Sequence, residues 1–159
     1  VLDRMAAAGG EHVGEAITSI AVEDLFTAVR SRLDTQQASR WGTRSAVDTI
    51  EAPREALVQM VENITRNGFD ACPQGVVSLE VTRRDGAVEL CFEDEGHGMD
   101  QDALKRATDP FFTTKQANDR MGLGLFLART LVDSLSGELI IESATDRGTM
   151  IRVVLPQAE

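Results

Sequence analysis

The stretch Asp94-Glu95-Gly96-His97-Gly98-Met99 follows directly on a strand-like apolar run, Val88–Phe92. A carboxylate at the end of such a strand can have a buried base, and a buried carboxylate needs hydrogen-bond donors. The exocyclic amine of adenine is one such donor. Gly96 and Gly98 permit close approach of the backbone and positive φ angles. A plain β-turn would use the same letters, so the neighbouring segments decide between the two interpretations.

A long helix is predicted upstream, beginning at Pro53, whose missing N–H suits the first turn of a helix. Its apolar residues recur with a period of 3.6, at Leu57, Met60, Val61 and Ile64. Asn63, Asn67 and Asp70 fall at i, i+4 and i+7 and share one face at the margin of that stripe. Asn in a helix interior is up to about 0.7 kcal/mol less favourable than Ala. Either this face is simply solvated, or it serves a ligand such as Mg²⁺, for which the neutral oxygen of Asn67 is suitable.

A second helix is predicted downstream, over Leu123–Leu135, with Gly122-Leu123-Gly124-Leu125 at its start. The glycines leave the free N–H groups of the helix start unblocked, and such starts bind anions. The preceding residues 95–121 lack sustained periodicity apart from a short helix at 101–107. A connection of that length in a compact domain is usually functional or mobile, so a lid is predicted there.

The predicted lid contains the stretch Pro110-Phe111-Phe112-Thr113-Thr114-Lys115. Its adjacent phenylalanines are either a docking surface or an anchor of the lid in the core. Lys115 and Arg120 are the cations placed to reach a phosphate, and plain solvation is the alternative for both. The sequence holds neither a G-x-x-x-x-G-K-[ST] loop nor a G-x-G-x-x-G after a strand, so it resembles neither a Walker loop nor a Rossmann fingerprint.

Composition limits the partners. The 159 residues suit one domain, and the formal net charge of −10 argues against nucleic acid, whose phosphates are bound by excess Lys and Arg. An anionic ligand would depend on local donors and a cation. Cys72 and Cys91 do not make a disulfide framework; Cys91 is expected in the core and Cys72 in a more open position.

Hairpins dominate the predicted strand order. Val76–Val81 and Val88–Phe92 are joined by the turn Arg83-Arg84-Asp85-Gly86, and a third helix is predicted at Glu23–Leu33. Further strands are predicted at 17–22, 43–50, 138–143 and 149–155. The expected fold class is α/β (α+β): a two-layer sandwich in which a mixed, largely antiparallel sheet packs on three helices.

The ordered motifs resemble the ATP-binding catalytic domain of sensor histidine kinases, within the superfamily that includes gyrase B, Hsp90 and MutL. The resemblance covers about residues 15–156. The matching motifs are Asn63-x-x-x-Asn67 for the N box, Asp94-x-Gly96-x-Gly98-Met99 for the G1 box, 111–115 for the F box, Gly122–Leu125 for the G2 box and Gly148-Thr149 for the last motif. The sequence of Met121–Ala128 also resembles that of the redox-responsive Reg/Prr-type kinases.

This resemblance implies a Bergerat-type fold, with ATP and Mg²⁺ as cofactors. It implies catalytic roles for Asn63, Lys115 and Arg120, and a metal ligand at Asn67. The residues implied to contact the nucleotide are Asn67, Asp70, Asp94, Gly96, Gly98, Met99, Thr114, Gly122, Leu123, Gly124, Leu125 and Thr149. Three positions depart from the usual pattern: Gly68 replaces an Ala, Asp70 a basic residue and Arg120 a glycine.

The resemblance also implies a domain organisation. Residues 1–14 are expected to be the tail of a preceding helical dimerisation domain and its linker, and 15–159 the catalytic domain, with the lid at about 95–121. His12 and His97 lack the helical His-Glu-x-x-x-Pro context of a phosphoacceptor. The implied partners are therefore ATP, a phosphoacceptor dimerisation domain of the same homodimeric protein and a response regulator, without nucleic acid. A cytoplasmic location of this domain is implied, and an inner-membrane anchor elsewhere is compatible with it.

Two other functions stay open beside the kinase domain: a self-contained ATPase clamp of the gyrase or MutL type, and a non-catalytic nucleotide-binding or interaction module. The clamp class carries a glutamate at the position of Asn63, which cannot act as a general base. Glu62 is one residue away, about 100° round the helix, and is expected to point elsewhere. The isolated chain is thus expected to bind Mg-ATP without labelling itself.

Overall fold

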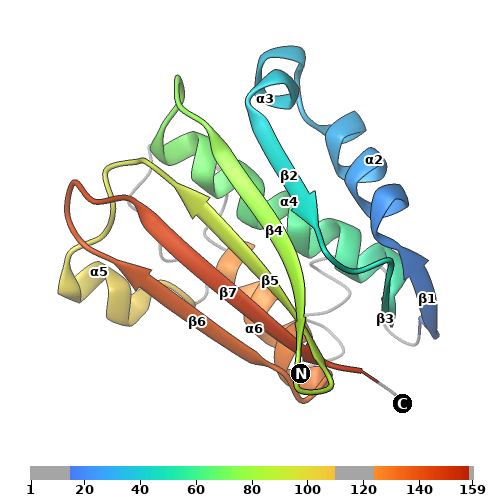
Figure 1. Ribbon diagram of the computed structural model, residues 1–159. Helices are drawn as coiled ribbons and strands as arrows, with labels where there is room; N and C mark the ends of the chain where they lie inside the picture. Colours follow the sequence, from blue (N-terminus) through green and yellow to red (C-terminus); the bar gives the residue numbers. More distant parts are fainter. Residues whose placement is uncertain (1–14, 110–123, 158–159) are drawn as a thin grey trace.

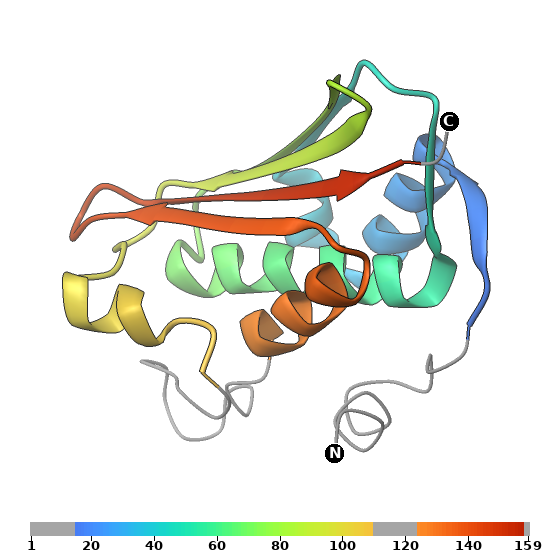
Figure 2. The same cartoon turned by 90° about the horizontal axis from the view of Figure 1, so that it is seen from below.

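The computed structural model describes residues 15–109 and 124–157, which form two layers, a sheet and a layer of helices (Figures 1 and 2). Viewed from below, the long helices lie under one side of the sheet (Figure 2). This arrangement confirms the predicted two-layer sandwich. In chain order the elements are β1 (Ile17–Ala21), α2 (Val22–Arg32), α3 (Thr35–Ser39), β2 (Trp41–Ser45), β3 (Thr49–Pro53), α4 (Arg54–Ala71), β4 (Val77–Arg84), β5 (Ala87–Asp94), α5 (Gln101–Arg106), α6 (Gly124–Ser134), β6 (Glu138–Ser143) and β7 (Thr149–Pro156).

The main sheet has five strands in the order β2-β4-β5-β7-β6. Its pairs are antiparallel except β2 with β4, so the mixed, largely antiparallel sheet is confirmed. The β4–β5 hairpin turns at Asp85 and Gly86, whose φ angles are 51° and 79°, and two positive φ angles are what a tight hairpin turn of matching twist requires. A separate two-stranded sheet, β1 with β3, was not anticipated.

The single strand predicted over 43–50 is wrong. The chain turns after β2, where the hydroxyl of Ser45 accepts from the N–H of Val47 at 3.0 Å and donates to its carbonyl at 2.7 Å. This local turn sends β2 into the main sheet and β3 into the small one. The short helix α3 was also not predicted; Asp34 caps it by accepting from the N–H of Gln37 at 2.7 Å.

The 18-residue helix α4 confirms the long helix predicted from its apolar period. Pro53 precedes its first residue as the cap and offers no side-chain hydrogen bond. Glu15, distant in sequence, takes over that role: its carboxylate accepts from the N–H groups of Glu55 at 2.9 Å and Ala56 at 3.3 Å. A negative side chain at this end also suits the helix dipole.

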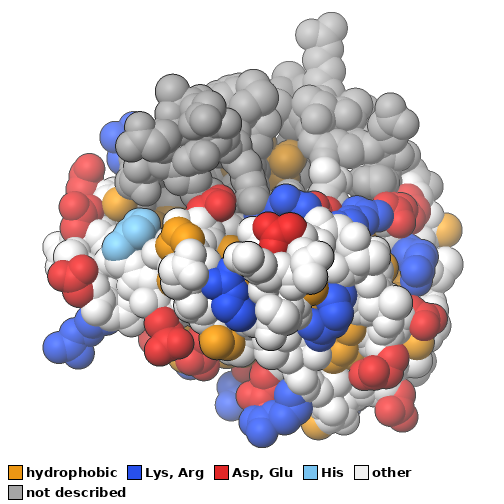
Figure 3. Space-filling view, turned by 90° about the horizontal axis from the view of Figure 1, so that it is seen from above, with side chains coloured by type: hydrophobic (Ala, Val, Ile, Leu, Met, Phe, Trp, Pro, Cys, Tyr) orange, Lys and Arg blue, Asp and Glu red, His pale blue; other side chains and the backbone are white. Residues whose placement is uncertain are grey.

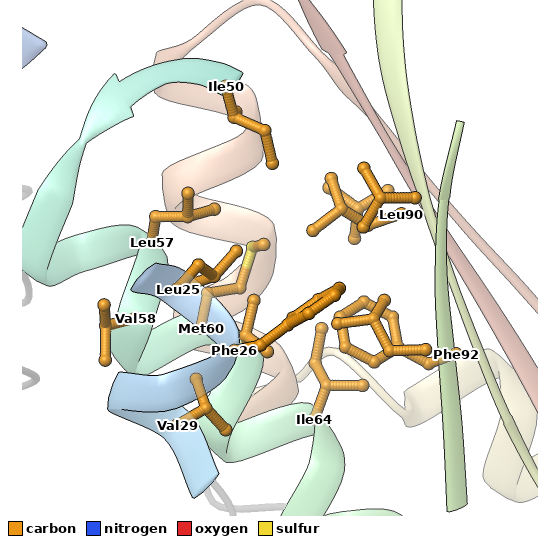
Figure 4. Close-up of a cluster of buried hydrophobic side chains, with 14 of the residues drawn as sticks. Leu25, Phe26, Val29, Ile50, Leu57, Val58, Met60, Ile64, Leu90 and Phe92 are labelled. Atoms are coloured by element: carbon orange, nitrogen blue, oxygen red, sulfur yellow. The ribbon is translucent and has the colours of Figure 1, made fainter. Parts of the chain in front are cut away.

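The core lies between the helices and the sheet. Side chains of α2 and α4, such as Phe26 and Ile64, face Leu90 and Phe92 of β5 (Figure 4). The core position expected for Cys91 is wrong: Cys91 alternates away from the buried Leu90 and Phe92 and is half-buried. Cys72 is half-buried as well and packs against the core cluster. None of the described helices combines the length and apolar character needed to cross a bilayer.

Candidate functional site

The helix α4 presents Asn63 and Asn67 half-buried at the margin of its apolar face, and Asp70 exposed one turn further on. The start of α6 lies against them. A Cβ placed on Gly124 would come within 3.3 Å of Nδ2 of Asn67 and 3.8 Å of Cβ of Asn63. The structure thus joins two motifs that are about sixty residues apart in sequence, and it does so at a helix N-terminus, where N–H groups lack intrahelical partners.

Asp94 ends β5 and is half-buried. Its carboxylate accepts from the N–H of Gly96 at 2.9 Å and from the backbone N–H of Thr149. Burial raises the pKa of Asp94 above its ordinary value; these two backbone donors and the nearby His97 oppose that rise without cancelling it. Because burial still outweighs these donors, one more hydrogen-bond donor would further stabilise the ionised carboxylate of Asp94.

The loop after Asp94 is held by close backbone contacts. Gly98 has a φ of +69°, and a Cβ there would lie 2.0 Å from the carbonyl oxygen of Ala144. Gly148 has a φ of +76°, and its Cβ would lie 2.1 Å from the carbonyl oxygen of Asp94. The positive φ expected at Gly98 is confirmed. Gly96 keeps a negative φ and is needed for space instead, since its Cβ would meet Ala71 of α4.

Asp94, Thr149 and Ser143 form a row across β5, β7 and β6. Thr149 pairs in register with Asp94 on one side and with Ser143 on the other. The hydroxyl of Ser143 also accepts from the N–H of Met99 at 2.9 Å, which ties the loop to the sheet. Sequence reasoning missed Ser143, because its partners lie in two other segments, the loop at Met99 and the start of β7, which the sequence alone does not bring together.

Gly68 links the two ends of this site. A Cβ on Gly68 would lie 2.9 Å from Cγ2 of Val77 and 3.4 Å from Cβ of Asp94. The departure from Ala at this position therefore has a physical reason: α4 approaches β4 and β5 too closely for a methyl group without rearrangement of Val77, whose side chain is 1% exposed. The close approach brings α4, the helix that carries the asparagines, near Asp94 at the end of β5.

Glu62 points away from this site, as expected. It forms ion pairs with Arg66 at 2.9 Å and with Arg32 of α2 at 3.4 Å.

The face in Figure 3 mixes acidic and basic side chains, with hydrophobic ones scattered singly over its described part. Of the other candidate residues, Leu125 packs beside the core, while Thr114, Lys115, Arg120, Gly122 and Leu123 lie outside the described residues.

Comparison with known proteins agrees with this geometry. Residues 52–159 match the family described as histidine kinase-, DNA gyrase B-, and HSP90-like ATPase. The chain is 36% identical over 108 residues to sporulation kinase C of Bacillus subtilis, covering 67% of this chain and 25% of that kinase. It is 31% identical over 105 residues to the anti-sigma F factor of Geobacillus kaustophilus, covering 66% of this chain and 68% of that protein. This chain therefore spans about a quarter of the kinase relative.

Solved structures share the fold. The mycobacterial sensor histidine kinase MprB superposes with a TM-score of 0.78 at 21% identity, over 89% of this chain and 98% of that one. Full-length ShkA, solved in complex with AMPPNP, superposes with a TM-score of 0.79 at 24% identity, over 97% of this chain and 34% of that one. The chain belongs to the histidine kinase-, DNA gyrase B-, and HSP90-like ATPase family.

Proposed function

We propose that this domain binds Mg-ATP and offers its γ-phosphoryl group to a histidine on a separate helical dimerisation domain. The observation that carries the proposal is that the candidate site has two chemically different ends. Asp94 and Thr149 supply hydrogen-bond acceptors at one end, and Asn67 lies against the start of α6 at the other. A ligand with an amine at one end and phosphates at the other fits this pair.

The acceptor end suits adenine. An ionised carboxylate has about four lone-pair sites, and the two backbone donors to Asp94 leave capacity for another donor. The exocyclic amine of adenine can supply it. Because Asp94 is half-buried, such a charge-assisted hydrogen bond is stronger than one at an exposed carboxylate.

The helix end suits phosphates. At a helix start, N–H groups without intrahelical partners and the helix dipole favour an anion, and the start of α6 would offer both. Mg²⁺ usually takes one or two protein oxygens, with phosphates and waters as its other ligands. The carboxamide oxygen of Asn67 fits that role, and the described residues contain no cluster of three or more His, Cys, Asp or Glu that would indicate a different metal site. Bound Mg²⁺ would neutralise phosphate charge there.

Asn63 and the neighbouring Glu62 favour transfer of the γ-phosphoryl group over hydrolysis of ATP. Asn63 has no proton-accepting group of suitable pKa, and Glu62 is engaged by Arg32 and Arg66 on another face of α4. Phosphoryl transfer asks mainly for positioning and electrostatic stabilisation, which Asn67 and the start of α6 would provide. Asn63 is proposed to contribute to that positioning.

Further roles extend the proposal beyond the described residues. Lys115 and Arg120 would stabilise the transferred phosphoryl group, and Thr114, Gly122 and Leu123 would contact the nucleotide from a lid at about 95–121. Met99, Asp70 and Leu125 are proposed nucleotide contacts within the described part. The protein partners would be the dimerisation domain and a response regulator, within a homodimer whose catalytic domain is cytoplasmic.

Membership of the redox-responsive Reg/Prr-type kinases has no support among the relatives described above. The cysteines argue against a reactive thiol as well. Burial raises the pKa of both Cys72 and Cys91 above the ordinary value; at Cys72 a backbone hydrogen bond from Glu95 opposes the rise and the charge of Asp94 adds to it. A raised pKa leaves less of the nucleophilic thiolate at neutral pH.

A second candidate is a nucleotide-dependent interaction module. The observation in its favour is the match to the anti-sigma F factor, of which this chain covers 68%, against 25% of sporulation kinase C. In that case the domain would act on a protein partner without a dimerisation domain in its own chain.

Incubation with γ-labelled ATP, with and without a separately supplied helical hairpin bearing an acceptor histidine, distinguishes these functions. The expected result is label on the hairpin histidine, recognised by its loss in acid, with little label on the domain alone. The Asn67→Ala variant should abolish the transfer, and Gln36→Ala on α3 serves as a matched control. Acid-stable label on the hairpin, no label on the hairpin, or brisk phosphate release without it would contradict the histidine kinase proposal.

A further inference from the structure

Ser143 ends β6, and its hydroxyl meets three polar groups. The N–H of Met99 lies 2.9 Å away, the carbonyl oxygen of Gly148 lies 2.9 Å away, and Oγ1 of Thr149 lies 2.8 Å away. None of these contacts involves the residues already proposed to hold the phosphates. All three contacts lie at the end of the site that is formed by β5, β7 and β6.

The donors and acceptors around Ser143 can be counted. A serine hydroxyl has one proton to donate and two lone pairs that accept. The carbonyl of Gly148 can only accept, so it takes the Ser143 proton. The N–H of Met99 can only donate, so it uses one lone pair. The contact with Thr149 must then use the second lone pair, which makes the Thr149 hydroxyl the donor.

This count fixes the polarity of Thr149. Its single hydroxyl proton is directed toward Ser143, so its oxygen offers only lone pairs to anything else that approaches. Thr149 also pairs in register with Asp94, whose carboxylate is an acceptor. The two neighbouring side chains therefore present acceptors together.

We propose that Ser143 is a specificity-determining positioning residue: by taking the hydroxyl proton of Thr149, it makes this end of the site select purines with a 6-amino group over those with a 6-oxo group. The proposal rests on the proposed function, because it places the purine base at Asp94 and Thr149. A 6-amino group donates to acceptors, directly or through a bridging water. A 6-oxo group accepts, and facing further acceptors leaves a polar group unpaired.

Removal of the Ser143 hydroxyl frees Thr149 to rotate and donate. Asp94 still disfavours a 6-oxo group, so selectivity should be reduced and not lost. In Ser143→Ala the ratio of ADP to GDP affinity should fall about tenfold, the size of one net hydrogen bond. Ser143→Thr keeps a hydroxyl at the same position and should retain the ratio.

Calorimetric titration of the domain with ADP and with GDP is the test. The variants are wild type, Ser143→Ala and Ser143→Thr, with Ser31→Ala as a control that removes an exposed hydroxyl from α2. If Ser143→Ala does not fold, Ser143→Cys replaces it, since a thiol keeps the shape and hydrogen-bonds only weakly. The proposal is supported if the ratio of ADP to GDP affinity falls in Ser143→Ala or Ser143→Cys but not in Ser143→Thr or Ser31→Ala.

Two other results separate the possible failures. Equal losses of ADP and GDP affinity in Ser143→Ala, with an unchanged ratio, would make Ser143 merely structural and overturn this inference while the adenine site stands. A wild-type domain that binds ADP and GDP equally, or binds neither, would instead overturn the placement of the base at Asp94 and Thr149, and the inference with it.

Discussion

The two ends of the proposed nucleotide site are built differently. At the base end, Asp94, Thr149 and Ser143 are fixed by strand register and by hydrogen bonds to backbone groups. At the phosphate end, Asn67 and Gly124 come from two helices and are placed by how those helices pack. The base end can therefore select a hydrogen-bonding pattern, whereas the phosphate end supplies charge stabilisation that depends on helix positions. Mutations should separate these two properties.

The largest effect is expected at the base end from Gly98→Ala. The left-handed φ should cost about 1–2 kcal/mol, and overpacking against the Ala144 carbonyl about 1–3 kcal/mol more. Urea unfolding measures this loss as a lower midpoint at constant slope. Gly86→Ala is the matched control, because its φ is +79° but a Cβ there meets nothing within 4 Å. Equal losses in the two variants would show that the close approach at Gly98 is unimportant.

At the phosphate end, Asn67→Ala should remove the Mg²⁺-dependent part of ATP affinity. The expected loss is about 1.5–3 kcal/mol at saturating Mg²⁺, the range for one hydrogen bond or ligand to a charged group. AMP affinity should stay near wild type, since AMP lacks the phosphates that share the metal. Titrations of ATP and AMP, with Mg²⁺ or with a chelator, measure both. An undiminished Mg²⁺ effect in Asn67→Ala would place the metal elsewhere.

The pH dependence should differ between the ends as well. Only ionised Asp94 accepts from the amine, so ADP affinity should fall as the pH drops through the pKa of Asp94. Burial raises that pKa, so the loss should begin at a higher pH than for an ordinary Asp near 3.9. In the free domain the sign is opposite: a raised folded-state pKa destabilises the fold at neutral pH, and protonation relieves this. Asp94→Asn should therefore leave ADP affinity flat over that window and keep or increase apo stability in urea.

The smallest effect is expected from Glu15→Ala, far from both ends. Loss of this cap on α4 should cost about 0.5–2 kcal/mol of stability, the usual range for a helix N-cap. ADP affinity should be unchanged, because α4 keeps its packing against the sheet. Thermal unfolding of Glu15→Ala measures this loss of stability. The control is Glu138→Ala, which changes an exposed residue of β6. A loss no greater than in that control would remove Glu15 from the stability of α4.

The fold was largely predictable where one segment decides its own structure. The apolar period of α4 and the Asp85-Gly86 turn are local signals, and both predictions are confirmed. The strand predicted over 43–50 failed because a turn held by the Ser45 hydroxyl divides two strands that belong to different sheets. Composition and period do not report which partner strand a residue meets.

The site followed the same rule. Asp94 and Asn67 stand in motifs whose order and spacing are visible in the sequence, and the structure places them with Thr149 and Gly124 as neighbours. Ser143 carries no such signal, since its role depends on the register of β6 with β7 and on a loop that returns to it. Glu15 likewise caps a helix that begins about forty residues later. Non-local hydrogen bonds are what a single sequence leaves out.

The most direct test of a nucleotide site anchored at its base end is ADP binding by Asp94→Asn. The amide replaces an acceptor by a donor, so ADP and AMP should both bind about ten- to a hundredfold more weakly, the equivalent of one hydrogen bond to a charged group. Asp85→Asn makes the same chemical change in the exposed turn before β5 and should bind like wild type. Equal ADP affinities for wild type, Asp85→Asn and Asp94→Asn would contradict the role of Asp94 in holding the base.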